Sequence, residues 1–556
     1  MAGFEDFEGI EAASDFTPGA QVPLSGSGGQ TAATQALASA AYRDGGFEKF
    51  LKANEGASLK PPRLSLFEPN LGEAFSRAVQ VRLLGGARGA LIQSFGIEPQ
   101  TVVEHCLAAT RIRKDRDTKL TVIMVIFGLL FLPGTLLWLL AFQLRRMIAG
   151  AQDKRMGAFG MAAMVALGGL AVLFMLKLPF DGLLAYYLRG MLIAPVIGWL
   201  WAKQVCERTA KMLRGQWEQL LGGGGLGAKI PEAVPQDPGD AGAERIRLGL
   251  AKLRAEQASN LVYYAGPKGI LGMGTRWGSW QLAEELVPKD PESEINPFRS
   301  WDVVRAIYDQ LRMLERSPLH TGGFPKPSVR HWIVSPIAEG ASSVSRPEGQ
   351  EVEGYRIKDF EIQRICNEQQ FGSGNRHYLG VQFVLWDGQL VITLMITVTV
   401  LHHTLRIEVT GHALGPVNGL FFDKPKAKTK TVSKGVKFWE TKTVNQPLVE
   451  TQEVVRLAAR APLTWFPPVL DFLGGKMTLP EPFGLRHAWA DKPWRHRFMA
   501  DDALRAATPV LRVVHAAALR VLEENGCNTD QFGARSNALS GSIPAVEPKK
   551  ADVYDA

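Results

Sequence analysis

The sequence predicts a helical membrane anchor joined to a soluble α+β domain with an antiparallel sheet. Three observations lead to this fold class. Long apolar runs occupy much of residues 120–202, strand and turn patterns fill residues 378–410, and helical patterns flank the strand pattern on both sides. We expect two or three transmembrane helices in the apolar part, with most of the mass outside the bilayer.

The apolar runs cover residues 120–144, 156–176 and 182–202, and their only charge is Arg189. At about 1.5 Å per residue, helices of this length match a hydrocarbon core of about 30 Å. Only 46% of the 556 residues are hydrophobic. This composition excludes a protein made mainly of membrane spans and predicts a multi-pass anchor in the cell (cytoplasmic) membrane.

Basic residues precede the first run, separate it from the second, and follow the third. Three simple spans alternate sides, so they cannot place all three basic flanks in the cytoplasm. Pro133-Gly134 lies near the middle of the first run, where a helix kinks or turns. A re-entrant first run would leave two crossings and resolve the conflict, and the alternative is one kinked spanning helix. We expect the C-terminal domain in the cytoplasm.

Two features inside the apolar part have alternative interpretations. Ala158, Ala162 and Ala166 form a face of small residues, which allows close helix packing on the third run or, alternatively, self-association into a homo-oligomer. Arg189 is a functional-site candidate because charges inside membranes are costly, but it lies near enough to the start of its run to snorkel to the interface.

Composition divides the chain into six segments. They are 1–41, a disordered acidic tail; 42–118, a small helical region; 119–203, the membrane block; 204–243, a basic flank with a Gly/Pro-rich linker; 244–530, the α+β domain; and 531–556, a disordered tail. In the first tail, Phe4, Phe7 and Ile10 are candidates for a partner-docking motif, and the alternative is a solvated terminus.

The α+β domain contains a strong hairpin signal. Residues 378–386 and 389–400 flank a turn at Asp387-Gly388, and residues 404–410 alternate as a third strand. Ser300 is expected to cap one helix, and Thr508 to cap another in which Pro509 occupies the first turn. These elements predict helices before and after an antiparallel sheet.

Catalytic signatures are absent from the sequence. There is no HExxH or G-x-S-x-G motif, and the four cysteines lack a zinc or disulfide spacing. We therefore predict no catalytic residues, no cofactor and no metal. An enzyme would have to use His402, His403, Glu408 or Arg189, although strand histidines are more often packed or surface residues.

A lysine-rich stretch is bracketed by the aromatic pairs Phe421-Phe422 and Phe438-Trp439. Its lysines are Lys424, Lys426, Lys428, Lys430, Lys434 and Lys437. Such a stretch suits an anionic membrane surface, and the alternative is a solvated loop. The net charge of +8 is also compatible with nucleic acid. Attachment to a membrane makes lipid the preferred partner and nucleic acid an unlikely one.

The residues Tyr263-Tyr264-Ala265-Gly266, then Gly272-Met273-Gly274, then Trp277 or Trp280 form a local pattern. This pattern resembles a stretch in an uncharacterised group of bacterial integral membrane proteins. The Pro-Phe that usually precedes the glycines is missing here. The likeness covers about twenty residues, and it implies no function because the group has none assigned.

The sequence thus favours a non-catalytic, membrane-anchored docking protein that recruits a protein partner or a large assembly through its N-terminal tail or its C-terminal domain. One alternative is a membrane-associated enzyme acting on a lipid or envelope substrate. The other is a small transporter or channel subunit, which would need to oligomerise because two or three spans cannot enclose a path.

Overall fold

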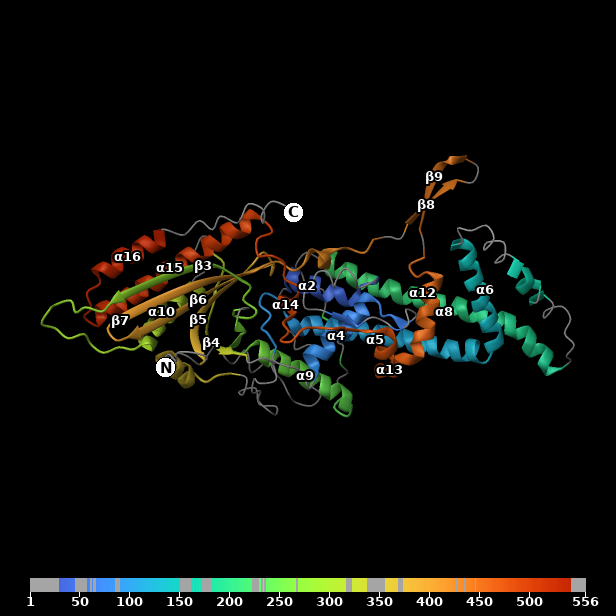
Figure 1. Cartoon of the computed structure of the whole chain (residues 1–556), viewed down its shortest axis with the longest axis horizontal. Coiled ribbons are helices and arrows are strands. Elements are labelled where there is room, and N and C mark those ends of the chain that lie inside the picture. The colour runs from blue at the N-terminus through green and yellow to red at the C-terminus, as the bar shows by residue number, and fades with distance from the viewer. Residues whose placement is uncertain are drawn as a thin grey trace.

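The structure is a computed structural model of the whole chain. It describes residues 30–45, 58–60, 63, 67–85, 91–150, 162–163, 165–169, 171–172, 182–222, 230–231, 234, 237–266, 269–316, 323–337, 356–368, 374–426, 429–434, 437–445 and 447–541. Figure 1 shows an elongated arrangement with a sheet unit at one end, a helical unit in the middle, and the apolar helices at the other end.

The sheet unit contains six strands in the order β2-β4-β5-β6-β7-β3. Their bounds are Leu261–Tyr264 (β2), Thr275–Glu285 (β3), Ser328–Pro336 (β4), Arg376–Leu385 (β5), Leu390–Leu401 (β6) and Thr404–Leu414 (β7). The sheet is mixed, because β2 pairs with β4 in parallel while the other pairings are antiparallel. The expectation of an antiparallel sheet is therefore met in four of the five pairings and fails at β2–β4. After the loop at 265–274, β3 joins the opposite edge instead of pairing with β2.

The predicted hairpin is confirmed as β5 and β6, and β7 is the predicted third strand. Its turn places Trp386, Asp387 and Gly388 at positive φ, which glycine adopts most easily. The β6 strand is interior to the sheet, and residues 390–396 are buried on both faces. This explains why residues on β6 are apolar without the alternation seen in β7.

Helices cover one face of the sheet. They are α10 (Ser300–Arg316), α11 (Asp359–Glu368), α15 (Arg497–Glu524) and α16 (Asp530–Gly541). The α15 helix begins eleven residues before Thr508, whose hydroxyl donates to the carbonyl of Leu504 instead of capping, and Pro509 lies inside the helix. The α16 helix packs on α15 and β3, so residues 531–541 are not part of a disordered tail.

The helical unit is built around one hydrophobic core. It contains α2 (Ala32–Ser39), η1 (Ala40–Tyr42), α4 (Leu71–Leu84), the first part of α5 (Pro99–Ile123), α9 (Ala241–Gln257) and the short α14 (Leu485–Ala488). Leu37 and Ala38 of α2 are completely buried, and Thr31 caps the helix. The expected tail over 1–41 is therefore wrong for residues 32–41, whose apolar side chains pack on α5. Residues 1–29 lie outside the described residues.

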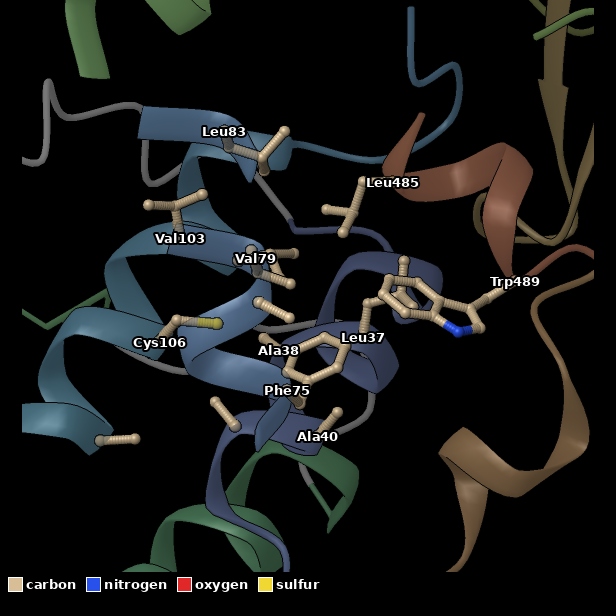
Figure 2. Packing of buried hydrophobic residues seen from close by; sticks show 14 of the residues in the cluster. Leu37, Ala38, Ala40, Phe75, Val79, Leu83, Val103, Cys106, Leu485 and Trp489 are labelled. Carbon is tan, nitrogen blue, oxygen red and sulfur yellow. The ribbon is translucent and has the colours of Figure 1, made fainter. Parts of the chain in front are cut away.

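The expected α+β domain over 244–530 does not form one spatial unit. Phe421, Phe483 and Trp489 return to the core of the helical unit, where Trp489 lies 5.1 Å from Phe75 between ring centroids. Figure 2 shows Trp489 and Leu485 closing this core opposite α4 and α5. The chain therefore passes three times between the helical unit and the sheet unit, after α9, after β7 and after α14, because apolar residues after β7 are buried in the core that contains α4.

The apolar segment consists of the end of α5, the π-helix η3 (Met124–Leu129), α6 (Leu132–Gly150) and α8 (Leu183–Gly222). Helix α5 continues through the expected boundary at residue 118, and α8 continues through the one at residue 203. Neither boundary therefore coincides with the end of a helix. In the described part of the chain, no single helix has both the length and the apolar character of a membrane span. The pair Pro99–Leu129 and Leu132–Ala141, bent by 98°, meets those criteria together.

The remaining elements follow β7. They are η8 (Gly419–Phe422), the hairpin β8 (Thr429–Lys434) and β9 (Lys437–Asn445), α12 (Thr451–Arg460), η9 (Ala461–Trp465), α13 (Pro467–Gly474) and β10 (Lys476–Thr478), which pairs with β1 (Ser58–Lys60). Figure 1 shows α12 running across α8 near the boundary between the helical unit and the apolar helices.

Candidate functional site

The apolar segment exposes an extensive hydrophobic surface. Its exposed large side chains are Val122, Val125, Ile126, Leu129, Leu130, Leu132, Leu136, Trp138, Leu139, Leu140, Val165, Val172, Tyr186, Tyr187, Ile193, Ile197, Leu200 and Trp201. Single exposed apolar residues are normal on proteins, but so many on packed neighbouring helices are typical of an interaction surface. This surface is the candidate functional site.

The bend between η3 and α6 occurs at Leu130–Phe131, three residues before the Pro133-Gly134 pair that suggested it. The hydroxyl of Thr135 lies 3.0 Å from the carbonyl oxygen of Gly128 and 3.1 Å from that of Phe131. A bend releases carbonyl groups from the helical ladder, and in an apolar environment each unsatisfied group is costly. Thr135 therefore stabilises the bend.

Close packing on α8 fixes the bent pair in position. A β-carbon added to Gly134 would lie 1.8 Å from the carbonyl oxygen of Met191, so only glycine permits this approach. The hydroxyl of Tyr187 donates to the carbonyl of Leu130 at 2.7 Å, and the indole of Trp138 donates to that of Leu192 at 3.0 Å. The bent pair and α8 thus form one packed unit.

The two ends of the apolar segment meet. Leu120 and Ala202 are both buried in one hydrophobic cluster, together with Leu457 and Ala461 from the α12–η9 region. Helix α5 leads into the apolar segment from the helical unit, and α8 leads back to it. The chain therefore enters and leaves the apolar segment at the same end, beside this hydrophobic cluster.

Aromatic and basic side chains lie on α8 beside Ala202, on η9, which begins at Ala461, and on α13. The ammonium group of Lys203 lies 5.5 Å from the ring of Trp199, and that of Lys114 lies 5.6 Å from the ring of Trp465. Phe466 and Phe472 are also exposed, at 65% and 57%. Aromatic rings mixed with basic residues are typical of membrane–water interfaces. We call Trp199, Trp465, Phe466, Phe472 and their basic neighbours the aromatic collar.

An ion pair attaches α12 to the helical unit. Arg460, almost fully buried, contacts Glu73 at the start of α4 through both of its terminal nitrogens. Burial alone would raise the pKa of Glu73, but the Arg460 guanidinium holds it below the usual value. The pair therefore remains charged and keeps the collar attached to α4.

The lysine-rich stretch forms an isolated hairpin where the sequence suggested a basic segment or a loop. Lys424 and Lys426 are exposed in the approach to it, and Lys430, Lys434 and Lys437 occupy positions on β8 and β9. Lys428 lies outside the described residues. Figure 1 shows the hairpin projecting from the body of the molecule at about the level of α12.

Other predicted site residues are scattered. Ala162 and Ala166 are exposed, as is Arg189 on α8, whereas Ala158 lies outside the described residues. Phe4, Phe7 and Ile10 lie outside the described residues as well.

The residues considered for an enzyme are not brought together with Arg189. His402 and His403 form the β6–β7 turn at positive φ, and Glu408 contacts Arg406 and Arg276. Within the described ranges, no group of three His, Cys, Asp or Glu side chains is arranged to hold a metal ion.

Sequence reasoning missed a buried histidine pair. His331 on β4 and His377 on β5 lie 3.0 Å apart between Nδ1 and Nε2, with Trp301 and Tyr308 of α10 packed against them. Burial lowers the pKa of His331 to about 4, and burial together with His331 lowers that of His377 well below its usual value. The two residues are far apart in sequence, and only sheet pairing joins them.

Comparison with known proteins gives one match. A family model described as an AbeC-like domain matches residues 279–547, just under half of the chain, and the chain is similar to that domain over β3–β10 and α10–α16. No curated protein and no solved structure matches. The matched range leaves out most of the stretch around Tyr263 that resembles the bacterial membrane proteins, so that resemblance stays an expectation.

Proposed function

We propose that this protein is a membrane-anchored, non-catalytic docking protein. The apolar helices η3, α6 and α8 insert into an anionic bilayer, and the sheet unit recruits a protein partner or a larger assembly. The observation that carries the proposal is the large number of exposed apolar side chains on η3, α6 and the first half of α8. In water, such a surface would promote aggregation, whereas lipid would cover it.

Two further observations support this arrangement. The aromatic collar lies where the apolar surface begins, as expected for a membrane–water interface. In addition, Leu120 and Ala202 share one cluster, which supports an even number of crossings with the sheet unit and the helical unit on the same side. With the basic flanks, this side would be the cytoplasm, and the first run would re-enter without crossing.

The sheet unit is well placed to recruit a partner. Figure 1 places it at the end of the molecule opposite the apolar helices. A partner bound there would be held away from the bilayer surface. The β8–β9 hairpin and its lysines would contact anionic headgroups nearer the membrane.

Liposome flotation of the full chain tests the anchor. We expect the detergent-purified protein to float with vesicles of phosphatidylcholine and phosphatidylglycerol after detergent removal, and to stay with them in 1 M salt, because apolar burial is not screened by salt. Insertion would be contradicted if the protein stayed at the bottom of the density gradient, or if 1 M salt released it from the vesicles.

Docking requires its own test. Amino acids with a photoreactive group are placed at exposed positions of the sheet unit, Phe360 in one variant and Arg512 in another. If the sheet unit recruits a partner, both variants should crosslink to the same protein in the native membrane. The matched control carries the group at the exposed Met212 on α8. Crosslinking that does not depend on the position of the group would contradict docking through the sheet unit.

A further inference from the structure

A small cavity lies beneath the collar, between α5, α8, the start of α12 and the start of α4. Its volume is about 40 Å³. The residues lining it are Tyr42, Arg43, Asp44, Asn70, Arg113, Arg116, Cys206, Thr209, Ala210, Leu213, Arg214, Leu448, Val449, Glu453 and Leu457. A single water needs only about 10–15 Å³ on such a measure, so the cavity has room for a group of several atoms.

Four arginines but only two carboxylates line this cavity. Arg113 is 5% exposed, and its terminal nitrogens donate to the backbone carbonyls of Gly72 at 3.3 Å and Ala41 at 2.6 Å. Arg116 is 6% exposed and bonds the neighbouring Asp117 at 2.8 Å. These guanidinium groups are held rigidly by the protein, with positive charge in excess at the cavity wall.

Two helix starts lie at this cavity, and each already has one carboxylate in its first turn, Glu73 in α4 and Glu453 in α12. Asn70 is the residue before α4, and Glu450 is the residue before α12; neither caps its helix through its side chain. Asn70 and Glu453 both line the cavity. The first turn of a helix carries partial positive charge, which favours an anion nearby.

The pKa values of the buried arginines shift in different directions, because Asp117 and Glu73 raise that of Arg116 above its usual value in spite of burial. Burial lowers the pKa of Arg113 to about 10, although Glu73 opposes the effect. Burial also lowers the pKa of Arg43 to about 10, with Asp423 opposing it. Both residues lie outside the apolar segment, which begins at Leu120. A bound anion would stabilise the charged form of both side chains.

We propose that this cavity binds a phosphate group. Planar guanidinium groups are suited to the tetrahedral oxygens of phosphate, because their fork of donors makes paired charge-assisted hydrogen bonds. The group can come from inorganic phosphate or from a phospholipid headgroup. The second source is within reach, because Cys206 and Leu457 belong both to the cavity wall and to the hydrophobic cluster at the collar. This inference does not require the docking function.

Arg214 and Asp44 provide matched variants. Arg214 donates to the Asp44 carboxylate from two nitrogens at 2.8 and 2.6 Å, so Asp44 competes with any incoming anion. Asp44→Asn should therefore tighten phosphate binding, and Arg214→Gln should weaken it by about tenfold, the effect of one charge-assisted hydrogen bond. Misfolding would weaken phosphate binding in both variants, so opposite effects on binding from the two members of one ion pair cannot both result from it.

The experiment is titration calorimetry of the full chain in detergent with inorganic phosphate, against sodium chloride at matched ionic strength. We expect saturable phosphate binding, tighter in Asp44→Asn, weaker in Arg214→Gln and unchanged in Arg520→Gln, which alters an exposed pair on α15. Absence of phosphate binding in both the wild type and Asp44→Asn, or equal binding in all four proteins, would overturn the proposal.

A second arm separates the two sources. Nanodiscs containing phosphatidic acid should abolish binding of inorganic phosphate if a lipid headgroup occupies the cavity, whereas pure phosphatidylcholine nanodiscs should not. Unchanged binding in both discs would assign the site to free phosphate. Flotation with liposomes should be the same for all variants, so failure of anchoring and failure of this site are distinguishable.

Discussion

Leu120 and Ala202, which begin and end the apolar segment, are buried in the same hydrophobic cluster. Helices α5 and α8 thus emerge from the apolar segment side by side. If the apolar segment inserts into a bilayer as proposed, this shared cluster favours an even number of crossings, because an odd number would separate the two residues by the thickness of a bilayer.

The first prediction follows from this contact. Asp115→Cys before the apolar segment and Glu218→Cys after it, both at exposed positions, should be labelled from the same side by a membrane-impermeant maleimide. The four native cysteines are buried and should remain unlabelled in the folded protein. Labelling of the two positions from opposite sides would contradict an even number of crossings.

The second prediction concerns the bend. Gly134→Val should destabilise the packing of α6 on α8 by about 1–3 kcal/mol or more, because the new side chain collides with the Met191 backbone. The free energy of unfolding in mixed detergent micelles measures this cost. Gly168→Ala is the control, because a β-carbon there has no neighbour within 4 Å. Equal stability of both variants would mean that α6 does not pack on α8 in this way.

The third prediction tests the collar. A polarity-sensitive fluorophore is attached to the cysteine of Phe466→Cys. Its emission should shift to shorter wavelength when the protein is transferred from amphipol into anionic liposomes, because Phe466 is 65% exposed at the proposed interface. The same label at Phe498→Cys, 69% exposed in the sheet unit, should not respond. A response at both positions, or at neither, would contradict this placement of the membrane surface.

The fourth prediction concerns pH. In the folded state, burial lowers the pKa of His331 to about 4, so the unfolded chain binds a proton first as the pH falls. The stability is therefore complete above about pH 6.5 and decreases as the pH falls toward 4. Replacing the residue by His331→Gln should reduce this slope by about 1.4 kcal/mol per pH unit between these limits, measured by urea unfolding.

Two controls make this pH prediction specific. His402→Gln, at the exposed β6–β7 turn, should leave the slope unchanged. A residual slope should persist in His331→Gln, because burial also lowers the pKa of His105 and of His412, to about 4 in each case. An unchanged slope in His331→Gln would mean that the pair is accessible to water in the folded protein.

The fifth prediction concerns the connection between the sheet and the helical unit. One terminal nitrogen of the fully buried Arg486 donates to the carbonyls of Gly388 at 3.0 Å, Gln389 at 2.9 Å and Gly415 at 2.5 Å. Arg486→Met should cost about 2–4 kcal/mol, because these carbonyls lose their donor. Arg512→Met, at an exposed position on α15, is the control for denaturant unfolding. Equal unfolding curves for the two variants would contradict the role of Arg486.

Local signals predicted individual elements well. The Asp387-Gly388 turn and the alternation in residues 404–410 correspond to the β5–β6 hairpin and to β7. Each of these signals is contained in a few neighbouring residues, because turn geometry and side-chain alternation act locally. The predicted cap at Thr508 is wrong because distant packing, and not the local sequence, sets where this helix begins. Packing of Met499 and Ala503 on the sheet extends α15 upstream of it.

Distant pairings were not predictable. The parallel contact of β2 with β4, the pair His331–His377 and the arginine-lined cavity each join residues separated by tens to hundreds of positions. The aromatic collar likewise depends on η9 reaching α5. A single sequence carries no local signal for such pairings, because each pairing depends on how the whole chain buries its apolar surface.

The sequence by itself determined the apolar character of residues 120–202, the strand pattern of β5–β7 and the clustering of basic residues, since each follows from composition and periodicity. The tertiary structure decided that the two ends of the apolar segment lie together, that Phe421, Phe483 and Trp489 complete the core of the helical unit, and that arginines from distant elements line one cavity. These relationships arise from burial of apolar surface, which depends on the whole chain and not on its neighbours in sequence.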